Sequence, residues 1–261
     1  VVIKAIQNNI AIYAAHTNLD NVQNGVNKMI CEKLGLKKTK ILSPKNNVLR
    51  KLVTFCPVDK AEQVRQALFE AGAGSIGNYD NCSFNAEGFG TFRGNEKTNP
   101  YVGKKGKQHH EKELRIETIF PSYLESQLLD ALFKAHPYEE VAYDIYPLAN
   151  HSKQTGSGMI GEFEKEMTEN AFLKKLKSAM KTKMVRHTQL LNRKVKKVAV
   201  CGGSGSFLLK DAIRAGADAF VSADFKYHQF FDADNRILVC DIGHYETEQF
   251  TGQLIYNFLS K

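Results

Sequence analysis

The sequence of 261 residues predicts a mixed α/β protein in which one α/β domain carries a second, inserted domain. Short apolar runs that are typical of buried strands alternate with stretches of helical periodicity along the chain. In the middle of the chain these elements follow the order βαβ–βαβ, which is the order of a ferredoxin-like split βαβ sandwich. The ends of such a module lie close together, so it suits insertion into another domain.

Residues 1–47 are predicted to form the N-terminal lobe of the outer domain. Apolar residues at helical spacing begin the chain, and the uninterrupted apolar run at 10–15 predicts a buried strand. The next apolar residues again recur at helical spacing, and Gly35 stands where a helix commonly ends. The apolar positions of this expected helix are Val22, Val26, Met29, Ile30 and Leu34.

Residues 48–148 are predicted to form the inserted ferredoxin-like module, and 149–261 the C-terminal lobe. The module should contain strands at 52–56, 114–120 and 140–146, helices at 60–71 and 121–135, and a hairpin arm at 81–92. The C-terminal lobe should contain an edge strand at 159–167, strands at 197–201, 219–222 and 237–239, and helices at 171–180 and 207–215.

The charge and cysteine content of the sequence indicate which partners and which cellular compartment to expect. The formal charge is +8, but the lysines occur as scattered pairs, which favours solvated faces over a nucleic-acid footprint. The five cysteines are far apart and form no Cys-x-x-Cys pair, which indicates reduced thiols and a cytoplasmic protein. No apolar run reaches the roughly 18 residues that a membrane span needs.

His244 and Glu248 form the first candidate site. They follow an apolar strand and begin a stretch whose apolar residues have helical spacing, so they lie four residues apart on one helix face. An imidazole and a carboxylate placed in this way can supply half of a metal site. The alternative is an ordinary first helical turn in which the dipole favours the acidic residue.

Three other polar residues and one glycine-rich segment also stand at expected strand ends. His16 and Asp20 follow the run at 10–15, where ligands collect in open α/β sheets, although Asp20 could instead cap the next helix. His228 could line the same cleft or be a core histidine. The glycine-rich turn at 202–206 could bind phosphate, but it lacks the Lys-Ser/Thr of a P-loop and could equally serve close packing.

Four segments in this order resemble the Nif-three-like family, also called GTP cyclohydrolase 1 type 2 homologues. They are AAHTNLD at 14–20, GGSG at 202–205, DFKYH at 224–228 and GHYETE at 243–248. The segment 135–144 is similar to the CutA/PII-like insertion of the longer bacterial members. The resemblance covers essentially the whole chain and implies a two-lobed α/β fold with a ferredoxin-like insertion.

The resemblance also implies two divalent metal ions per subunit and assembly into a homohexamer. By position, Asp20, His244 and Glu248 match the family's metal ligands, and His16 and His228 match positions close to them. The family's other two ligands lie in an upstream His-His-Pro motif that this sequence does not contain. The N-terminal lobe is therefore expected to be truncated, with three of five ligands present. Mixed Asp, Glu and His ligands accept zinc, iron or manganese.

Two functions remain open. In the first, the protein is a dinuclear metal hydrolase acting on a nucleotide or a related ring compound, with Asp20 bridging the ions and His16 or His228 transferring protons. In the second, it is a metal-binding scaffold or regulatory protein whose inserted PII-like module senses a small ligand and whose ring contacts partners. The small-molecule substrate is unknown in either case.

Overall fold

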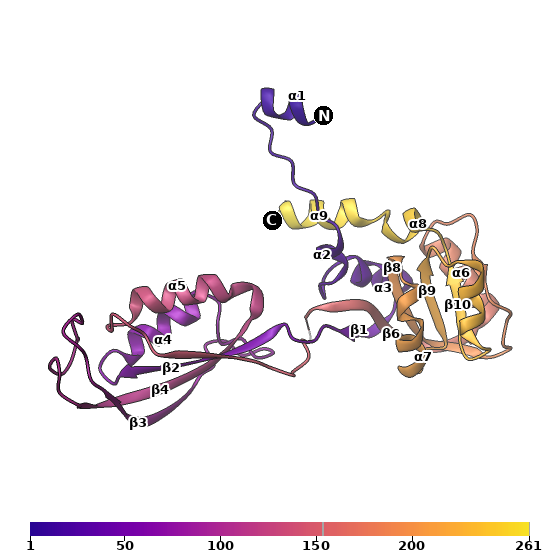
Figure 1. Ribbon diagram of the computed structural model, residues 1–261. Coiled ribbons are helices and arrows are strands. Elements are labelled where there is room, and N and C mark those ends of the chain that lie inside the picture. Colours follow the sequence, from indigo (N-terminus) through magenta and orange to yellow (C-terminus); the bar gives the residue numbers. More distant parts are fainter. Residues whose placement is uncertain (153, 261) are drawn as a thin grey trace. The chain divides into compact units, whose positions relative to one another are not determined.

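The computed structural model describes residues 1–152 and 154–260, which fold as two compact units. The first unit combines Val1–Lys45 with the described residues from 154 onward, and the second is Asn46–Ser152. Figure 1 shows the elements of both units. The predicted mixed α/β class is confirmed, since each unit contains one β-sheet with packed helices.

The first unit is built on a six-stranded sheet in the order β1-β6-β8-β9-β10-β7. The central strands β8, β9 and β10 are parallel, and the outer pairs are antiparallel. Parallel strands of this kind are buried on both faces, which explains their near-continuous apolar sequences. The six strands are β1 (Lys37–Pro44), β6 (Gly156–Thr168), β7 (Arg186–His187), β8 (Lys194–Ser204), β9 (Ala219–Ala223) and β10 (Leu238–Asp241).

Two apolar clusters cover opposite faces of this sheet. On one face, α3 (Val26–Leu34) and α6 (Glu169–Ala179) pack against alternate residues of β8, β9 and β10. On the other face, the 3-10 helix η2 (Ser206–Leu208), α7 (Leu209–Arg214) and the 3-10 helix η3 (Tyr227–Ala233) pack against the intervening residues. The alternation of side chains along a strand thus produces a three-layer unit.

The first unit also contains α1 (Val2–Gln7), α2 (Thr17–Asp20), α8 (His244–Glu248) and α9 (Thr251–Leu259). The predicted helix before Gly35 is α3, and Gly35 ends it in the left-handed conformation with φ of 78°. This conformation is the usual reason for a glycine at a helix C-terminus.

The second unit contains β2 (Leu49–Pro57), α4 (Ala61–Glu70), β3 (Phe84–Phe92), β4 (His109–Pro121), the 3-10 helix η1 (Ser122–Leu124), α5 (Glu125–Ala135) and β5 (Tyr143–Pro147). Its antiparallel sheet has the order β3-β4-β2-β5. This is the strand order of a split βαβ sandwich. One face of the sheet packs against α4 and α5 through an apolar core.

Two sequence-based predictions of strands are wrong. Residues 10–15 form no strand, and Ile10, Ile12 and Tyr13 are exposed. An apolar run becomes a strand only where another strand accepts its backbone hydrogen bonds, and no strand among the described residues pairs with this run. The segment 159–167 is a strand but not an edge, because β6 pairs with β1 on one side and with β8 on the other.

No helix in residues 1–152 and 154–260 combines the length and the apolar character needed to cross a membrane.

The core of the first unit gives a stability prediction. Phe172 of α6 is fully buried and meets Phe163 edge-on with ring centroids 6.2 Å apart. Phe172→Ala should therefore lower the free energy of unfolding of this unit by about 3–5 kcal/mol. Urea denaturation measures the change. The control Phe207→Ala removes a ring that is 66% exposed and should change stability by less than about 0.5 kcal/mol.

Candidate functional site

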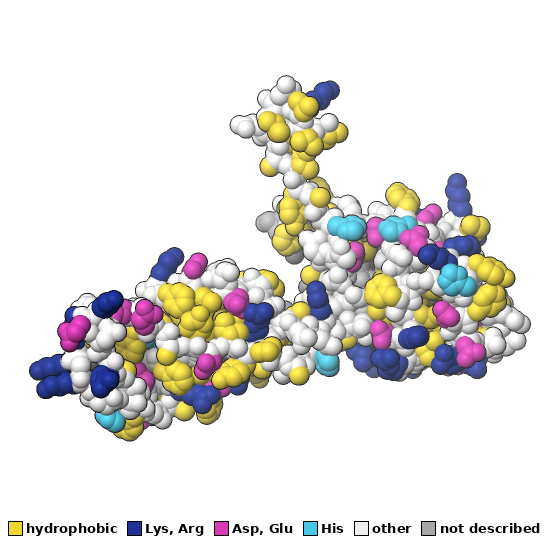
Figure 2. Space-filling view, in the orientation of Figure 1, with side chains coloured by type: hydrophobic (Ala, Val, Ile, Leu, Met, Phe, Trp, Pro, Cys, Tyr) yellow, Lys and Arg dark blue, Asp and Glu magenta, His cyan; other side chains and the backbone are white. Residues whose placement is uncertain are grey.

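The candidate site lies at the carboxyl ends of the three parallel strands. Gly203 stands near the end of β8, Asp224 directly follows β9, and His244 begins α8 just after β10. Ligands in open α/β sheets bind at this edge because strand ends and loops converge there. In the view of Figure 2, histidine and acidic side chains lie side by side on the surface of the first unit.

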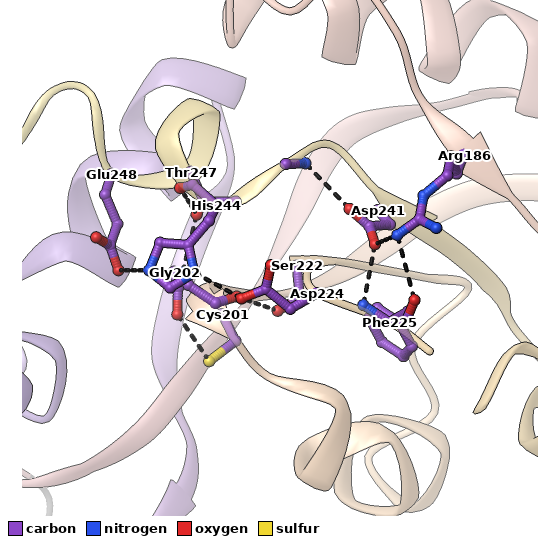
Figure 3. Close-up of polar contacts among 12 residues, drawn as sticks. Arg186, Cys201, Gly202, Ser222, Asp224, Phe225, Asp241, His244, Thr247 and Glu248 are labelled. Atoms are coloured by element: carbon purple, nitrogen blue, oxygen red, sulfur yellow. Dashed lines mark hydrogen bonds and ion pairs between the residues drawn. The ribbon is translucent and has the colours of Figure 1, made fainter. Parts of the chain in front are cut away.

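His244 stands between two carboxylates. Its Nδ1 lies 2.6 Å from Oδ2 of Asp224, and its Nε2 lies 3.5 Å from Oε1 of Glu248. Figure 3 shows the three side chains in a row. Because Asp224 accepts a hydrogen bond from the Nδ1–H group, it orients the ring and directs Nε2 toward Glu248. Metal-binding histidines are typically held in this way, with a carboxylate on the nitrogen away from the metal.

Buried Asp241 holds both loops that carry the His244–Asp224 pair. Its Oδ2 accepts a hydrogen bond from the Phe225 backbone N–H at 3.0 Å, and its Oδ1 accepts one from the Gly243 N–H at 3.0 Å. Phe225 directly follows Asp224, and Gly243 directly precedes His244. Arg186 forms an ion pair with the same carboxylate and also donates to the Phe225 carbonyl oxygen. These bonds fix the two loops relative to each other (Figure 3).

Gly202 and Gly203, in the glycine-rich segment at 202–206, serve close packing. The Gly203 N–H donates to the Thr247 hydroxyl at 2.8 Å, and that hydroxyl donates to the His244 carbonyl oxygen. A Cβ on Gly203 would lie 2.7 Å from Oε1 of Glu248, and φ of Gly203 is +61°. The Gly202 N–H donates to Asn27 at 2.9 Å. Since side chains already engage these two N–H groups, neither is free to bind a phosphate.

Asp20 is placed beside this turn by Asn27. The buried Asn27 amide donates to the Asp20 carbonyl oxygen at 2.8 Å while its oxygen accepts from Gly202. Asn27 thus connects the end of α2 to the end of β8. Asp20 also ends α2 rather than preceding α3 directly, and no side-chain cap bond forms at the start of α3. The structure does not support the alternative in which Asp20 caps the following helix.

The site concentrates negative charge around one imidazole. Burial raises the pKa of Asp20, and the nearby Glu248 raises it further, while His16 and His244 act in the opposite direction. The pKa of His244 is raised mainly by its hydrogen bond to Asp224, with Glu248 and Asp20 adding to the effect against partial burial. Asp20 and His244 therefore both lie within electrostatic range of Glu248, and a cation would relieve the repulsion between the carboxylates.

The two other predicted histidines, His16 and His228, differ in how close they lie to this site. His16 lies near enough to Asp20 to lower its pKa, and its Nδ1 bonds to the Thr17 hydroxyl at 3.0 Å. Its Nε2 carries no hydrogen bond within the described residues. His228 lies on η3 and is exposed, so it is not a core histidine. In the part of the chain that is described, it shows no interaction with Asp20, His244 or Glu248.

Asp20, His244 and Glu248 carry the oxygen and nitrogen donors that divalent metals bind, and the distance between two of these donor atoms fits a shared ion. Two donors about 2.1 Å from a tetrahedral ion lie about 3.4 Å apart, close to the 3.5 Å between His244 Nε2 and Glu248 Oε1. Burial raises the pKa of the nearby Cys201 thiol to about 12, and Asp20 adds to the effect. Across residues 1–152 and 154–260, however, no three His, Cys, Asp or Glu side chains stand together as a complete metal-binding group.

Sequence reasoning missed four residues that position this site. Asp224 was part of a recognised segment, but its contact with His244 depends on a loop conformation with φ of 58° at Asp224. Asn27, Asp241 and Thr247 act through buried hydrogen bonds to the backbone of distant residues. One signal was present for Asp241, since an acidic residue that ends an apolar strand run requires a buried partner.

Comparison with known proteins gives consistent matches. The model of the family Duf34/NIF3 (NGG1p interacting factor 3) matches residues 1–261. The GTP cyclohydrolase 1 type 2 homolog of Halalkalibacterium halodurans is 44% identical over 94% of this chain, and that of Bacillus subtilis 42% over 93%. The matches span 66% and 65% of those proteins, so the chain covers just under two thirds of their length.

Solved structures agree with the sequence matches. A Bacillus cereus protein related to NIF3 superposes with a TM-score of 0.80 at 42% identity, covering 99% of this chain and 71% of that one. A Staphylococcus aureus protein superposes with a TM-score of 0.69 at 30% identity, covering 99% of this chain and 69% of its own.

The His244–Asp224 contact predicts a pH effect. Because the folded-state pKa of His244 is raised, the pair stabilises the chain below the unfolded pKa of about 6.5, and this contribution is lost as pH rises through the folded-state value. Asp224→Asn should move the His244 pKa back down, as followed by NMR titration of its ring. Asp232→Asn, on exposed η3, should leave the titration unchanged. An identical His244 pKa in Asp224→Asn would contradict the assignment.

Gly203 and Gly216 provide a matched test of the close approach at the turn. Both have positive φ, +61° and +71°, so alanine at either costs about 1 kcal/mol in backbone strain. A Cβ on Gly216 meets nothing within 4 Å, whereas one on Gly203 meets Glu248 and His244. Gly203→Ala should therefore destabilise the chain more and shift the His244 ring resonances. Equal effects of the two variants would show that the turn does not constrain the site.

Proposed function

Because the chain belongs to the Duf34/NIF3 family, we propose that its protein is a metal-dependent hydrolase that holds two divalent ions and acts on a nucleotide-like substrate. The observation that carries this proposal is the pair of His244 and Glu248 where β10 leads into α8, with Asp224 orienting the imidazole and with Asp20 within electrostatic range. The names of the relatives, GTP cyclohydrolase 1 type 2 homologs, agree with a hydrolytic reaction on a nucleotide.

In this proposal Asp20, His244 and Glu248 hold metal through their oxygen atoms and Nε2. Bound divalent ions would supply activated water and stabilise developing negative charge. Asp224 keeps Nε2 of His244 directed toward the ion site. His16 is placed beside Asp20 with Nε2 open, so it can accept or donate a proton during the reaction. His228 is retained as a second proton-transfer candidate that would act at the substrate.

The proposal assigns the remaining metal donors to residues outside this sequence. Three side chains do not complete a dinuclear site, and the described residues contain no group of three or more donors placed for an ion. The match leaves about a third of each relative's length uncovered. A His-His-Pro segment, as the family resemblance implies, would bring two further imidazoles. Zinc, iron and manganese all accept this combination of nitrogen and oxygen ligands.

We also propose that the protein assembles as a hexamer of three dimers and works in the cytoplasm. Large apolar side chains of α1, of residues 10–13 and of α9 are exposed in the single chain, and such surfaces usually contact another chain or segment. All five cysteines are free and four are buried, which supports a reducing compartment. Sedimentation analysis of the complete protein would measure the assembly.

Metal content tests the proposal directly. Plasma emission should find two ions per subunit in a longer form that includes the His-His-Pro segment and fewer in the present chain. Equal metal in both forms would show that Asp20, His244 and Glu248 suffice or that other ligands exist. No metal in either form would exclude the metal-dependent hydrolase and favour the scaffold or regulatory function.

Glu248→Gln should remove metal and turnover from the longer form while leaving its fold intact, because an amide is a poor ligand for a divalent ion beside an imidazole. Glu246→Gln is the matched control, since Glu246 lies on the same helix but its carboxylate lies beside Gly243. Plasma emission, turnover and circular dichroism measure the three properties. Unchanged metal content in Glu248→Gln would rule out Glu248 as a ligand.

A further inference from the structure

The second unit contains a pocket of about 660 Å³ on the sheet face opposite α4 and α5. The side chains of β2 and β4 that pack against the helices include Leu52 and Ile116, and the residues that line the pocket alternate with them. The segments 93–101 and 138–142 enclose the sides. This volume falls within the range of small-molecule sites, about 300–1,000 Å³.

The floor of the pocket is flat because β3 has almost no side chains there. Ala86, Gly88 and Gly90 occupy successive positions on the same face of β3. A Cβ on Gly88 would meet no atom within 4 Å, so the space above it is open. A flat floor of this kind admits a planar ring against the backbone.

Aromatic side chains form the walls. The Phe92 and Tyr138 rings have centroids 6.1 Å apart, and the Tyr101 and Tyr138 rings 6.2 Å apart, both in tilted arrangements. Phe55 of β2 adds further aromatic surface to the lining. Faces and edges of such rings bind planar aromatic molecules and cations.

A buried carboxylate supplies the polar group. Glu113 is 7% exposed, lines the pocket, and accepts a hydrogen bond from the Tyr138 hydroxyl on Oε1 at 2.8 Å. Its Oε2 lies over Gly90, where a Cβ would come within 2.1 Å. Within the described residues, no donor bonds to Oε2. A buried carboxylate with one hydrogen bond is left with unused acceptor capacity, which a ligand donor would satisfy.

The charge of the lining favours a cation or a strong N–H donor. The described side chains around the pocket include three carboxylates and two guanidinium groups, and one of the latter, Arg115, is paired with Glu117 outside the pocket at 2.9 Å. These carboxylates are Glu113, Glu139 and Glu140, whereas Glu87 of β3 points to the other face and pairs with Lys112 at 2.8 Å. An anionic ligand would meet this excess of negative charge, whereas a positively charged or amine-bearing edge would be attracted by it.

We propose that this pocket binds a small planar aromatic molecule that presents an N–H-donating edge, such as an amidine, a guanidine or an amino-substituted nitrogen heterocycle, to Glu113. The ring lies on Ala86 and Gly88 between the aromatic walls, and its donors satisfy Oε2 of Glu113, which lies over Gly90. Tyr138 holds the other oxygen and so orients the carboxylate. The inference does not rest on metal binding by the first unit.

Benzamidine is the probe, because it is planar, cationic and carries two parallel N–H donors, and benzamide is its neutral comparison. Calorimetric titration of the full chain should show benzamidine binding at least tenfold more tightly than benzamide, as expected for a charge-assisted hydrogen bond. Glu113→Gln keeps an acceptor for Tyr138 but removes the charge, so the preference should disappear. Glu70→Gln removes an exposed carboxylate from α4, on the other face of the sheet, and should leave the preference unchanged.

Gly88→Ala provides a second variant that should fold normally, since its Cβ meets open space. The added methyl group would raise the floor and should weaken benzamidine binding severalfold, with circular dichroism unchanged. Gly90→Ala would displace the Glu113 carboxylate and should weaken benzamidine more than benzamide. Equal affinities for the two probes, or benzamidine binding that survives both Glu113→Gln and Gly88→Ala, would overturn the proposal.

Discussion

The first unit depends on one buried carboxylate that must be neutralised where three parallel strands end. Asp241 is 4% exposed, and isolation of such a charge from water is costly unless hydrogen bonds and a counter-charge compensate for it. Arg186 and two backbone N–H groups provide this compensation. Because those N–H groups belong to the residues next to Asp224 and His244, the requirement to satisfy Asp241 also sets the geometry of the candidate site. Removal of Arg186 would leave the buried Asp241 carboxylate without its counter-charge, so this pair links the stability of the unit to the geometry of the candidate site.

The same principle explains why the site is precise although its side chains are exposed. His244 and Asp224 are both accessible to water, and an exposed ion pair alone would hold them weakly. Their backbones are instead fixed by fully or nearly buried partners, since Asn27 and Thr247 link Asp20 and α8 to the end of β8. A metal site needs this combination, because its ligands must be reachable by ions and substrate while their positions remain set by the core.

The sequence predicted the helices and strands that have strong local patterns. It did not predict the pairings and side-chain contacts that depend on residues far away in the chain. The class, the helix that ends at Gly35 and the joint placement of His244 with Glu248 follow from periodicity, which is encoded locally. The apolar run at 10–15 has the composition of a strand but no neighbour, and the internal position of β6 depends on β1, which the sequence did not indicate. Contacts such as Asp224 with His244 join segments 20 residues apart and depend on loop conformation. Such contacts produce no periodic pattern in the sequence, so they cannot be predicted from it.

The candidate sites in the two units share one feature. A hydrogen bond to one polar atom of a side chain orients that side chain, so that its second polar atom is available to a ligand. Asp224 occupies Nδ1 of His244 and leaves Nε2 beside Glu248, while Tyr138 occupies Oε1 of Glu113 and leaves Oε2 over Gly90. In both places a glycine permits the approach, since a Cβ on Gly203 or Gly90 would collide with the directed group. The surroundings then select different ligands. Carboxylates around an imidazole favour a metal ion, whereas a single buried carboxylate among aromatic rings favours a flat organic molecule with N–H donors.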